Sequence, residues 1–188
     1  MRVIAGTARR LQLKSVEGMI TRPTADRIKE TIFNIINDRL YGAVFVDLFA
    51  GSGGIGIEAL SRGAKTAIFV DNSRRAVSVI KENLEHTHFE DKGRVYFGDV
   101  LSVISRLGEL PHLDVIYIDP PYKGDFYGPV LAKLSELGNV DSDTLIIIEA
   151  DKHIGFDFIE DMDYTIERVK DYKTNKHLFV RKTTERRS

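Results

Sequence analysis

The most constraining feature of this sequence is the stretch VFVDLFAGSGGIG, residues 44–56. A short apolar, β-prone run ends at Asp47, a glycine-rich turn follows, and the apolar spacing of a helix begins at Ile55. Strand, tight glycine turn and helix start form the geometry that cradles a nucleotide-like ligand. Glycine is required there because a Cβ would clash in the turn and keep the ligand away from the backbone. The stretch therefore predicts an α/β fold with a ligand site at this turn.

The acidic residue ahead of the glycines indicates which ligand suits the turn. A dinucleotide fingerprint places its glycines directly after the strand and presents a helix N-terminus to a pyrophosphate. Here Asp47 stands between the strand and the glycines, and a carboxylate suits a cationic amine better than a phosphate. S-adenosylmethionine carries an amine and a sulfonium but no phosphate, so the turn favours this cofactor over NAD. An NAD-dependent oxidoreductase stays the alternative.

Composition limits the classes of protein that remain. The 188 residues, 43% of them hydrophobic, suffice for one globular domain with a substantial core. The chain has no cysteine, which excludes disulfides and thiolate metal sites, and its five histidines show no metal-ligand spacing. No apolar run approaches the roughly 18 residues of a membrane span, and residues 1–10 lack a signal-peptide core. We therefore expect a cytoplasmic enzyme that holds no metal and spans no membrane.

Both ends of the chain are basic around an acidic middle. Residues 1–40 carry a net charge of +4, residues 168–188 carry +6, and residues 41–167 carry −11. Two β-prone runs, 2–4 and 11–13, flank a turn with Arg9 and Arg10 and so predict an N-terminal β-hairpin. A polyanion such as RNA is the natural partner of such ends. The alternative is an edge hairpin whose arginines only face solvent.

Two further predicted strands are followed by acidic residues. The apolar run 67–70 is closed by Asp71, about twenty residues after the glycine turn, where nucleoside-binding sheets hydrogen-bond ribose hydroxyls. The run 95–97 is followed by Asp99, which could accept a hydrogen bond from an adenine amine. Each has a simpler alternative, because either carboxylate could cap the helix that follows it.

The next strand, residues 114–118, runs into Asp119-Pro120-Pro121-Tyr122. Two prolines cannot extend a central strand, so they stiffen the turn and leave the carbonyls of Asp119 and Pro120 without ladder partners. An acidic side chain, fixed carbonyls and an aromatic ring can accept hydrogen bonds from an exocyclic amine and stack the base that carries it. The alternative is a rigid proline turn with Tyr122 packed locally, which the neighbouring glycine turn disfavours.

The remaining segments predict the rest of a sheet and one more helix. The apolar run 145–148 predicts a fifth buried strand, and residues 164–169 and 177–180 predict a final hairpin with a basic turn. Apolar residues at helical spacing predict a helix from residue 24 to about 40, with its apolar face in the core.

These motifs, in this order, resemble the RsmD family of small-subunit (16S) ribosomal RNA guanine-N2 methyltransferases over nearly the whole chain. MRVIAG (1–6) is similar to the family's opening, RPTADR (22–27) to its signature helix, DLFAGSG (47–53) to its cofactor loop and DPPY (119–122) to its amine-methylation motif. The last motif also occurs in adenine-N6 DNA methyltransferases. The chain departs from the family where Arg9-Arg10-Leu11 replaces the usual Arg-Gly-Arg, and where Lys173 replaces a common glycine. Both departures lie in segments expected to contact RNA.

The resemblance implies the class I methyltransferase fold: an α/β Rossmann-like, mostly parallel seven-stranded sheet with helices on both faces, plus a small N-terminal β-hairpin. It implies a hairpin extension at residues 1–20 and an S-adenosylmethionine-dependent domain at 21–188. It also implies methyl transfer from S-adenosylmethionine to the N2 amine of a guanine in 16S rRNA, free or in an assembling small subunit, by a monomer. An adenine-N6 DNA methyltransferase and a non-catalytic S-adenosylmethionine- or RNA-binding module remain as alternatives.

The motifs and the resemblance together define three groups of candidate residues. The catalytic group is Asp119, Pro120, Pro121 and Tyr122. In this group the guanine is expected to stack on Tyr122, and its amine is expected to donate to Asp119 and the carbonyl of Pro120. The cofactor-binding group is Asp47, Phe49, Ala50, Gly51, Ser52, Gly53, Asp71, Asn72, Asp99, Val100 and Asp119. The RNA-binding group is Arg2, Arg9, Arg10, Lys14, Arg22, Arg27, Lys123, Lys173 and Lys176.

Overall fold

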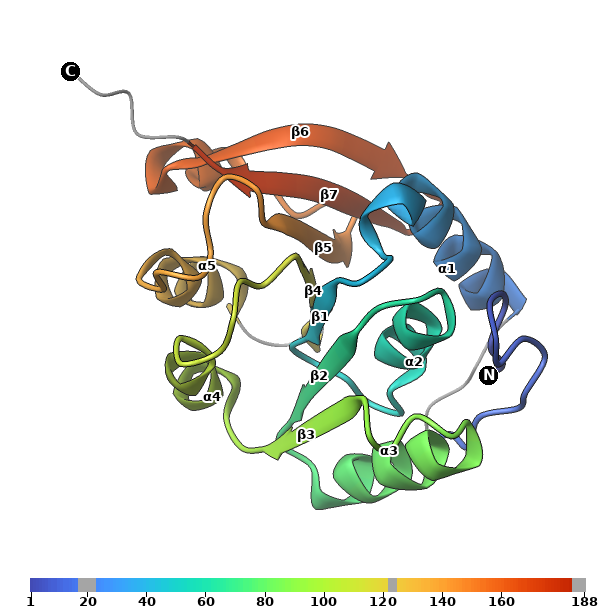
Figure 1. The fold of residues 1–188 in the computed structure, drawn as a ribbon. Helices are drawn as coiled ribbons and strands as arrows, with labels where there is room; N and C mark the ends of the chain where they lie inside the picture. Colours follow the sequence, from blue (N-terminus) through green and yellow to red (C-terminus); the bar gives the residue numbers. More distant parts are fainter. Residues whose placement is uncertain (17–22, 122–124, 184–188) are drawn as a thin grey trace.

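The computed structural model describes residues 1–16, 23–121 and 125–183, and its strands form one twisted sheet with helices on both faces (Figure 1). The elements in chain order are α1 (Pro23–Ile35), η1 (Asn37–Arg39), β1 (Val44–Asp47), α2 (Gly54–Ser61), β2 (Thr66–Asp71), α3 (Arg74–His86), β3 (Gly93–Phe97), α4 (Val100–Leu107), β4 (Val115–Ile118), α5 (Tyr127–Ser135), β5 (Leu145–Asp151), η2 (Asp157–Met162), β6 (Tyr164–Asp171) and β7 (Asn175–Lys182).

The seven strands lie in the order β3-β2-β1-β4-β5-β7-β6. Strands β1 to β5 pair in parallel, and β7 runs antiparallel to both of its neighbours, β5 and β6. The mostly parallel seven-stranded sheet and the final hairpin expected from the sequence are confirmed. The expected helix from residue 24 to about 40 is shorter, because α1 ends at Ile35 and a 3₁₀ turn, η1, follows.

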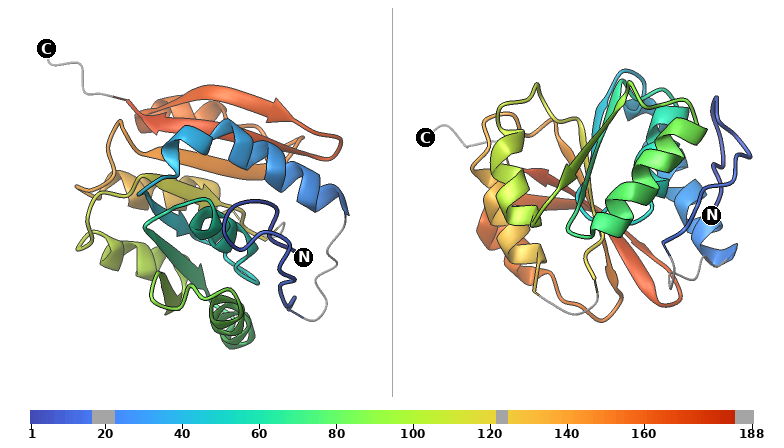
Figure 2. Two further views of the ribbon diagram at one scale, coloured as in Figure 1. Left: turned by 45° about the vertical axis from the view of Figure 1, so that its right-hand side comes forward. Right: turned by 90° about the horizontal axis from the view of Figure 1, so that it is seen from below.

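Successive side chains along each strand point to opposite faces of the sheet, so the core has two layers, one on each face. In β1, Phe45 packs with α1, α2 and α3, whereas Val46 packs with α4 and α5 on the opposite face. Figures 1 and 2 show the same division, with α4 and α5 on one side of the sheet and α1, α2 and α3 on the other. The central strands are buried on both faces, which explains their nearly continuous apolar runs.

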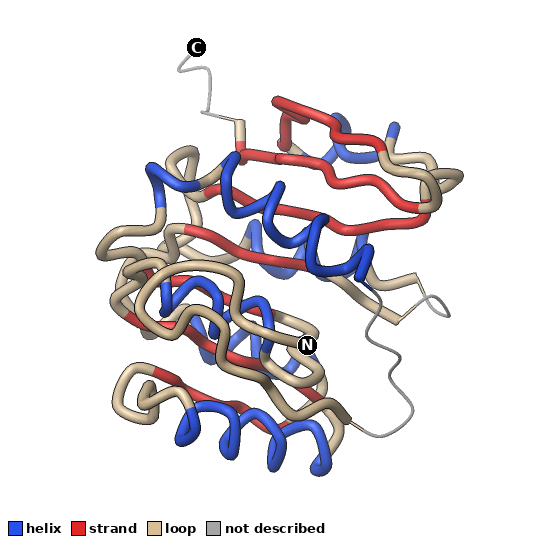
Figure 3. The backbone as a smooth tube through the Cα atoms, turned by 90° about the vertical axis from the view of Figure 1, so that its right-hand side faces the viewer, coloured by secondary structure: helices blue, strands red, loops and turns tan. Residues whose placement is uncertain are grey.

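The N-terminal hairpin is less regular than the sequence predicted. Arg2 and Gln12 form a single antiparallel bridge, and the rest of the segment is turn and loop (Figure 3). The backbone takes positive φ at Gly6 (81°) and Arg10 (73°), so it cannot continue as two extended strands. A Cβ at Gly6 would lie 1.8 Å from the carbonyl oxygen of Ser61, so this turn presses directly on the end of α2. The boundary at residue 20 stays a prediction, because residues 17–22 lie outside the described part.

One buried glutamate attaches this segment to the sheet domain. The carboxylate of Glu58, on α2, accepts hydrogen bonds from the backbone N–H groups of Ile4 (2.8 Å) and Ala5 (3.0 Å). It also pairs with Arg62 Nε at 2.8 Å and Lys29 Nζ at 3.3 Å. The Glu58 side chain is completely buried, and Lys29 Nζ donates in addition to the carbonyl of Arg2 at 2.7 Å. The arginine-bearing segment is therefore held by a charge cluster between α1 and α2.

The helices of the described ranges are all too short or too polar to cross a lipid bilayer. Parallel pairing brings the carboxyl ends of β1 to β5 to one edge of the sheet, which is where ligands bind in folds of this class. The acidic residues that follow the apolar runs meet at this edge.

Candidate functional site

The glycine turn joins β1 to α2 as predicted. Ala50 N donates to the carbonyl of Val70 at 2.9 Å, which ties the turn to β2. Gly53 caps α2 with a positive φ of 80°, and a Cβ there would lie 3.3 Å from Ile80 and Phe69. At Gly56 a Cβ would lie 2.4 Å from the Phe69 ring, so α2 can approach β2 only with glycine at this position. The glycines therefore set both the turn and the close packing of α2.

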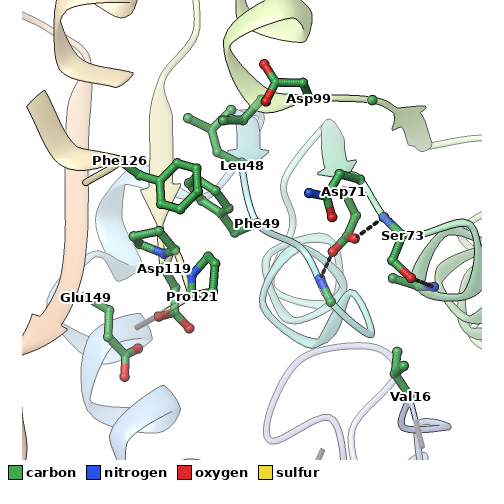
Figure 4. Close-up of a pocket in the computed structure, with 16 residues that line it drawn as sticks. Val16, Leu48, Phe49, Asp71, Ser73, Asp99, Asp119, Pro121, Phe126 and Glu149 are labelled. Carbon is green, nitrogen blue, oxygen red and sulfur yellow. Dashed lines mark hydrogen bonds between the residues drawn. The ribbon is translucent and has the colours of Figure 1, made fainter. Parts of the chain in front are cut away.

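A cavity of about 520 Å³ opens at the carboxyl edge of the sheet, within the range of small-molecule sites. Figure 4 shows side chains from the ends of β1, β2, β4 and β5 around it. The rings of Phe49 and Phe126 meet edge to face, with centroids 5.5 Å apart, and form an apolar wall. The lining residues are Val16, Leu48, Phe49, Gly51, Asp71, Asn72, Ser73, Ala76, Gly98, Asp99, Val100, Asp119, Pro120, Pro121, Phe126 and Glu149.

Most of the predicted cofactor and catalytic residues line this cavity. Those that do are Phe49, Gly51, Asp71, Asn72, Asp99, Val100, Asp119, Pro120 and Pro121. Four predicted cofactor residues instead build the turn from behind without lining the cavity: Asp47, Ala50, Ser52 and Gly53. Tyr122, the predicted stacking residue, lies outside the described residues.

Asp71 clamps the glycine turn to β2. Its Oδ2 accepts from the N–H of Gly51 at 2.8 Å, and its Oδ1 accepts from the N–H of Ser73 at 2.8 Å (Figure 4). Helix α3 is capped by Ser73 itself, whose hydroxyl accepts from Ala76 N. Each carboxylate oxygen can accept a second hydrogen bond, so the clamp leaves Asp71 able to bind a ligand hydroxyl from the cavity.

Asp99 caps α4 and faces the cavity at the same time. Its Oδ1 accepts from the N–H groups of Leu101 (3.0 Å) and Ser102 (3.2 Å). The capping role that the sequence left open is therefore present. The cap uses one oxygen, and Asp99 lines the cavity together with the neighbouring Val100.

Asp47 lies beneath the turn. Asp47 is only 2% exposed, and this burial raises the pKa of its carboxyl to about 7. The negative charge of Asp71 makes a smaller contribution to the rise in pKa. The backbone N–H groups of Gly56 and Phe49 favour the carboxylate and limit this rise in pKa. The carboxyl therefore ties the turn to the start of α2 from below.

Asp119 and Glu149 are neighbours across two strand ends. Ile118 pairs with Ile148 in the parallel β4–β5 ladder, so the residues that follow them occupy equivalent positions on one face. Asp119 is open to the cavity, yet protein surrounds it on its other sides. Desolvation by the surrounding protein raises the pKa of the Asp119 carboxyl well above its usual value, and the negative charges of Glu149 and Asp47 raise it further. A carboxylate with such a raised pKa is a stronger proton acceptor.

Glu149 is anchored from three directions by residues of β4 and β7. Its Oε2 accepts from the Tyr117 hydroxyl and from His177 Nε2 at 3.0 Å, and its Oε1 accepts from Asn175 Nδ2 at 2.6 Å. Desolvation opposes the charge, but the hydrogen bonds from His177, Tyr117 and Asn175 hold the pKa of Glu149 below its usual value. The sequence reasoning missed Glu149, although it follows an apolar run just as Asp71 does.

The lining of the cavity is acidic. It contains the carboxylates of Asp71, Asp99, Asp119 and Glu149 and, among the described residues, no lysine, arginine or histidine. Such a lining attracts a cationic ligand and repels phosphate. No group of three or more Asp, Glu or His side chains in the described ranges is arranged to hold a metal ion.

Two further hollows gather part of the predicted RNA-binding group. Arg2, Arg9, Arg10 and Arg27 line one hollow of about 420 Å³ with Asp26 and Glu30, and Asp26 pairs with Arg2 at 3.1 Å. Arg27 also lines a second hollow of about 370 Å³, whose other basic residues, Lys170 and Lys173, lie on the β6–β7 hairpin. Arg27 thus connects the two basic ends of the chain, which are far apart in the sequence.

Two predicted RNA-binding lysines have partners within the protein. Lys14 Nζ pairs with Glu82 at 2.6 Å, and Lys176 Nζ donates to the carbonyl of Ile154 at 2.6 Å and lies over the Phe156 ring. The Lys14 side chain is still 69% exposed, and contact of either lysine with RNA stays a prediction. Arg22 and Lys123 lie outside the described residues.

Comparisons with known proteins indicate one family for this chain. The family model described as "Conserved hypothetical protein 95" matches residues 1–180. The chain is 39% identical to the "Putative rRNA methyltransferase YlbH" of Bacillus subtilis, over 82% of this chain and 84% of that protein. It is 33% identical to the "Ribosomal RNA small subunit methyltransferase D" of Haemophilus influenzae, over 81% of this chain and 79% of the relative.

Solved structures show the same architecture. The "Putative methyltransferase yhhF from Escherichia coli" superposes with a TM-score of 0.83 at 26% identity, over 98% of this chain and 99% of that one. The predicted class I methyltransferase fold is thereby confirmed.

Proposed function

The chain belongs to the RsmD family, the one whose model is described as Conserved hypothetical protein 95, and from this premise we propose that it methylates ribosomal RNA. In detail, it transfers the methyl group of S-adenosylmethionine to the N2 amine of a guanine in the 16S rRNA of the small subunit. The relatives named as small-subunit rRNA methyltransferases support the class of substrate. The chemistry of the cavity supports the methyl donor and the acceptor atom.

The observation that carries the proposal is the acidic lining of the cavity. S-adenosylmethionine presents an ammonium and a sulfonium, which four carboxylates and no basic side chain among the described lining residues would stabilise. The pyrophosphate of NAD would meet only repulsion there. Asp71 would hold the ribose hydroxyls, Asp99 and Val100 the adenine edge, and the turn at Gly51 the methionine portion. Asp47 would support this turn from beneath.

When bound, S-adenosylmethionine supplies the methyl group. The chain's own residues act on the acceptor: Asp119 and the Pro120 carbonyl accept hydrogen bonds from the guanine amine and orient the nitrogen lone pair. The raised pKa of Asp119 suits it to take the proton that the amine loses. Positioning and electrostatics then supply most of the acceleration. Tyr122 is expected to stack the flipped base.

The basic hollows around Arg27 would guide the RNA. Arg9 and Arg10 come from the N-terminal segment and Lys173 from the β6–β7 hairpin, so a phosphate backbone could contact both ends of the chain across the site. We propose that a monomer binds either free 16S rRNA or an assembling small subunit.

A transfer assay with radiolabelled S-adenosylmethionine tests the proposal. The substrates are naked 16S rRNA, small subunits from cells that lack this protein, and duplex DNA. We expect label in one or both RNA substrates, as N2-methylguanosine after nuclease digestion, and none in DNA. Label on adenine in DNA would instead indicate an amino-methyltransferase of another substrate class. No transfer to any substrate, despite measurable cofactor binding, would favour a binding module.

A further inference from the structure

Among the residues that the structure describes, three donors reach the carboxylate of Glu149, and they leave one of its acceptor positions open. An ionised carboxylate offers about four lone-pair sites, two on each oxygen. Tyr117 and His177 occupy both sites of Oε2, and Asn175 occupies one site of Oε1. The second lone-pair site of Oε1 is therefore open, and the Glu149 side chain that carries it lines the cavity beside Asp119 (Figure 4).

The three donors also determine which kind of ligand atom this site can take. Burial and the charge of Glu149 raise the pKa of Tyr117 well above its usual value, so its hydroxyl remains a donor. His177 is fully buried, and its Nε2 faces a carboxylate that can only accept, so this nitrogen carries the hydrogen. With three donors directed at it, Glu149 stays ionised, and its open position can accept a hydrogen bond but cannot donate one.

The position of Glu149 next to Asp119 places two acceptors side by side. The β4–β5 ladder ends at the pair Ile118–Ile148, and the next residue of each segment, Asp119 and Glu149, lines the same cavity, where the charge of Glu149 acts on Asp119. On the Watson–Crick edge of guanine, N1–H and the N2 amine are neighbouring donors. Adenine instead presents an N1 acceptor beside its amine. Two adjacent carboxylates therefore match guanine and would place a negative charge against N1 of adenine.

We propose that Glu149 accepts a hydrogen bond from N1–H of the guanine whose N2 amine meets Asp119, and so selects guanine over adenine. This inference rests on the function proposed above. It makes Glu149 a specificity residue that touches the substrate base, and it makes Tyr117, His177 and Asn175 the residues that position it.

Base analogues test this role without any mutation. Once the target guanine is mapped, the wild-type protein is given RNAs with guanine, 6-thioguanine or 2-aminopurine at that position. 6-Thioguanine keeps N1–H and the amine, whereas 2-aminopurine keeps the amine but has an unprotonated N1. We expect kcat/KM for 2-aminopurine to fall about 100-fold or more, because a buried acceptor is left unpaired. 6-Thioguanine should stay within about fivefold of guanine, well short of the loss that an unpaired acceptor causes. Equal use of 2-aminopurine and guanine would overturn the inference.

The variant Glu149→Gln provides the second test, with the exposed Glu109→Gln as its matched control. The amide of Gln can donate to an unprotonated N1. The ratio of kcat/KM for guanine RNA to kcat/KM for 2-aminopurine RNA should therefore fall at least tenfold in Glu149→Gln and stay unchanged in Glu109→Gln. The same ratio is measured without turnover, as RNA affinity in the presence of S-adenosylhomocysteine. If Glu149 has only a structural role, Glu149→Gln should lower the affinity for both RNAs by the same factor. An unchanged ratio of this kind would overturn the inference.

The outcomes separate this inference from the proposed function. If the wild-type protein methylates no guanine at N2, the proposed function fails and Glu149 loses this role with it. If guanine is methylated but 2-aminopurine serves equally well, only the role of Glu149 fails. Should Glu149→Gln not fold, as judged by urea unfolding, the analogue series on the wild-type protein still decides.

Discussion

Glu58 and Glu149 are both enclosed glutamates that several elements contact, but only Glu149 lines the cavity. Glu58 has four partners, Ile4 N, Ala5 N, Lys29 Nζ and Arg62 Nε, which use the full acceptor capacity of a carboxylate. Glu149 has three donors in the part of the chain that the structure describes, which leaves one acceptor position open. The comparison indicates that a fully paired buried carboxylate stabilises the fold, whereas one open acceptor at a cavity is available to a ligand.

The largest effect should come from Glu58→Ala. The substitution leaves Lys29 and Arg62 as nearly buried cations without their anion, and it releases the N-terminal segment. Removing one partner of a buried pair costs about 3–5 kcal/mol, so urea unfolding should show a loss of this size. Glu90→Ala, at an exposed position, should change little. A loss below about 1 kcal/mol, the size expected of an exposed pair, would break the comparison.

Asp47 is a third kind of buried carboxyl, because no lysine, arginine or histidine of the described ranges pairs with it. Its folded pKa of about 7 exceeds the ordinary value of 3.8, so the folded state binds the proton more tightly. This stabilisation is complete below about pH 4 and is lost as the pH rises to 7, by at most about 4 kcal/mol. The stability of wild type relative to Asp47→Asn should therefore fall between pH 4 and pH 8.

Denaturant unfolding across this pH range measures the difference, with the exposed Asp91→Asn as control. Parallel pH profiles for wild type and Asp47→Asn would show that folding leaves the pKa of the Asp47 carboxyl unchanged. In that case Asp47 would resemble Glu58 in having its charge compensated.

Asp119→Ala tests the cavity side of the comparison. Asp119 is expected to hold the amine and accept its proton, so the rate of transfer should fall about 10²–10⁴-fold. The affinity for S-adenosylmethionine, measured by calorimetry, should stay within about threefold, a change of less than 1 kcal/mol. Methylation at a rate near wild type would remove this residue from the catalytic group.

A smaller effect, on cofactor affinity, is expected from Asp71→Ala. The substitution removes the proposed acceptor for the ribose hydroxyls and the clamp on Gly51 N. Loss of a charge-assisted hydrogen bond should weaken S-adenosylmethionine binding about 10- to 100-fold. Calorimetry with unchanged affinity would contradict the assignment, whatever happens to the rate.

The smallest effect is expected on RNA binding, from substitutions in the arginine-lined hollow that contains Arg9, Arg10 and Arg27. If Arg9 and Arg10 each contact a phosphate, replacing both by alanine should lower the slope of log affinity against log salt by about 1.5–2. Lys65→Ala is the control, because Lys65 is exposed and directly precedes β2, at the edge of the sheet opposite the cavity. Equal slopes for the wild type and the double variant would place the RNA elsewhere on the surface.

The sequence predicted those parts of the site that depend on local patterns. The glycine turn, and the acidic residues that follow apolar runs at Asp71, Asp99 and Asp119, needed only strand and turn signals. Glu149 carries the same signal after the run 145–148, but its partnership with Asp119 depends on the β4–β5 register. Long-range pairing of this kind has no local signature.

Other features depended on tertiary contacts that no short pattern records. Glu58 is one acid in the apolar helix GIGIEALS, and its partners come from α1 and the N-terminal segment. The N-terminal strands were predicted from β-prone residues, but Gly6 and Arg10 take positive φ as the turn meets Ser61. Lys176 was predicted to contact RNA from its place beside the basic hairpin turn, and no local pattern showed that its ammonium donates to the carbonyl of Ile154.

If this acidic cavity serves the N2 amine of a ribosomal guanine, the modification must be visible by mass mapping of 16S rRNA. Modified nucleotides are compared in rRNA from cells with the protein, without it, and complemented with wild type or Asp119→Ala. One N2-methylguanosine should disappear without the protein, return with wild type and stay absent with Asp119→Ala. An unchanged set of N2-methylguanosines in cells without the protein would contradict the account.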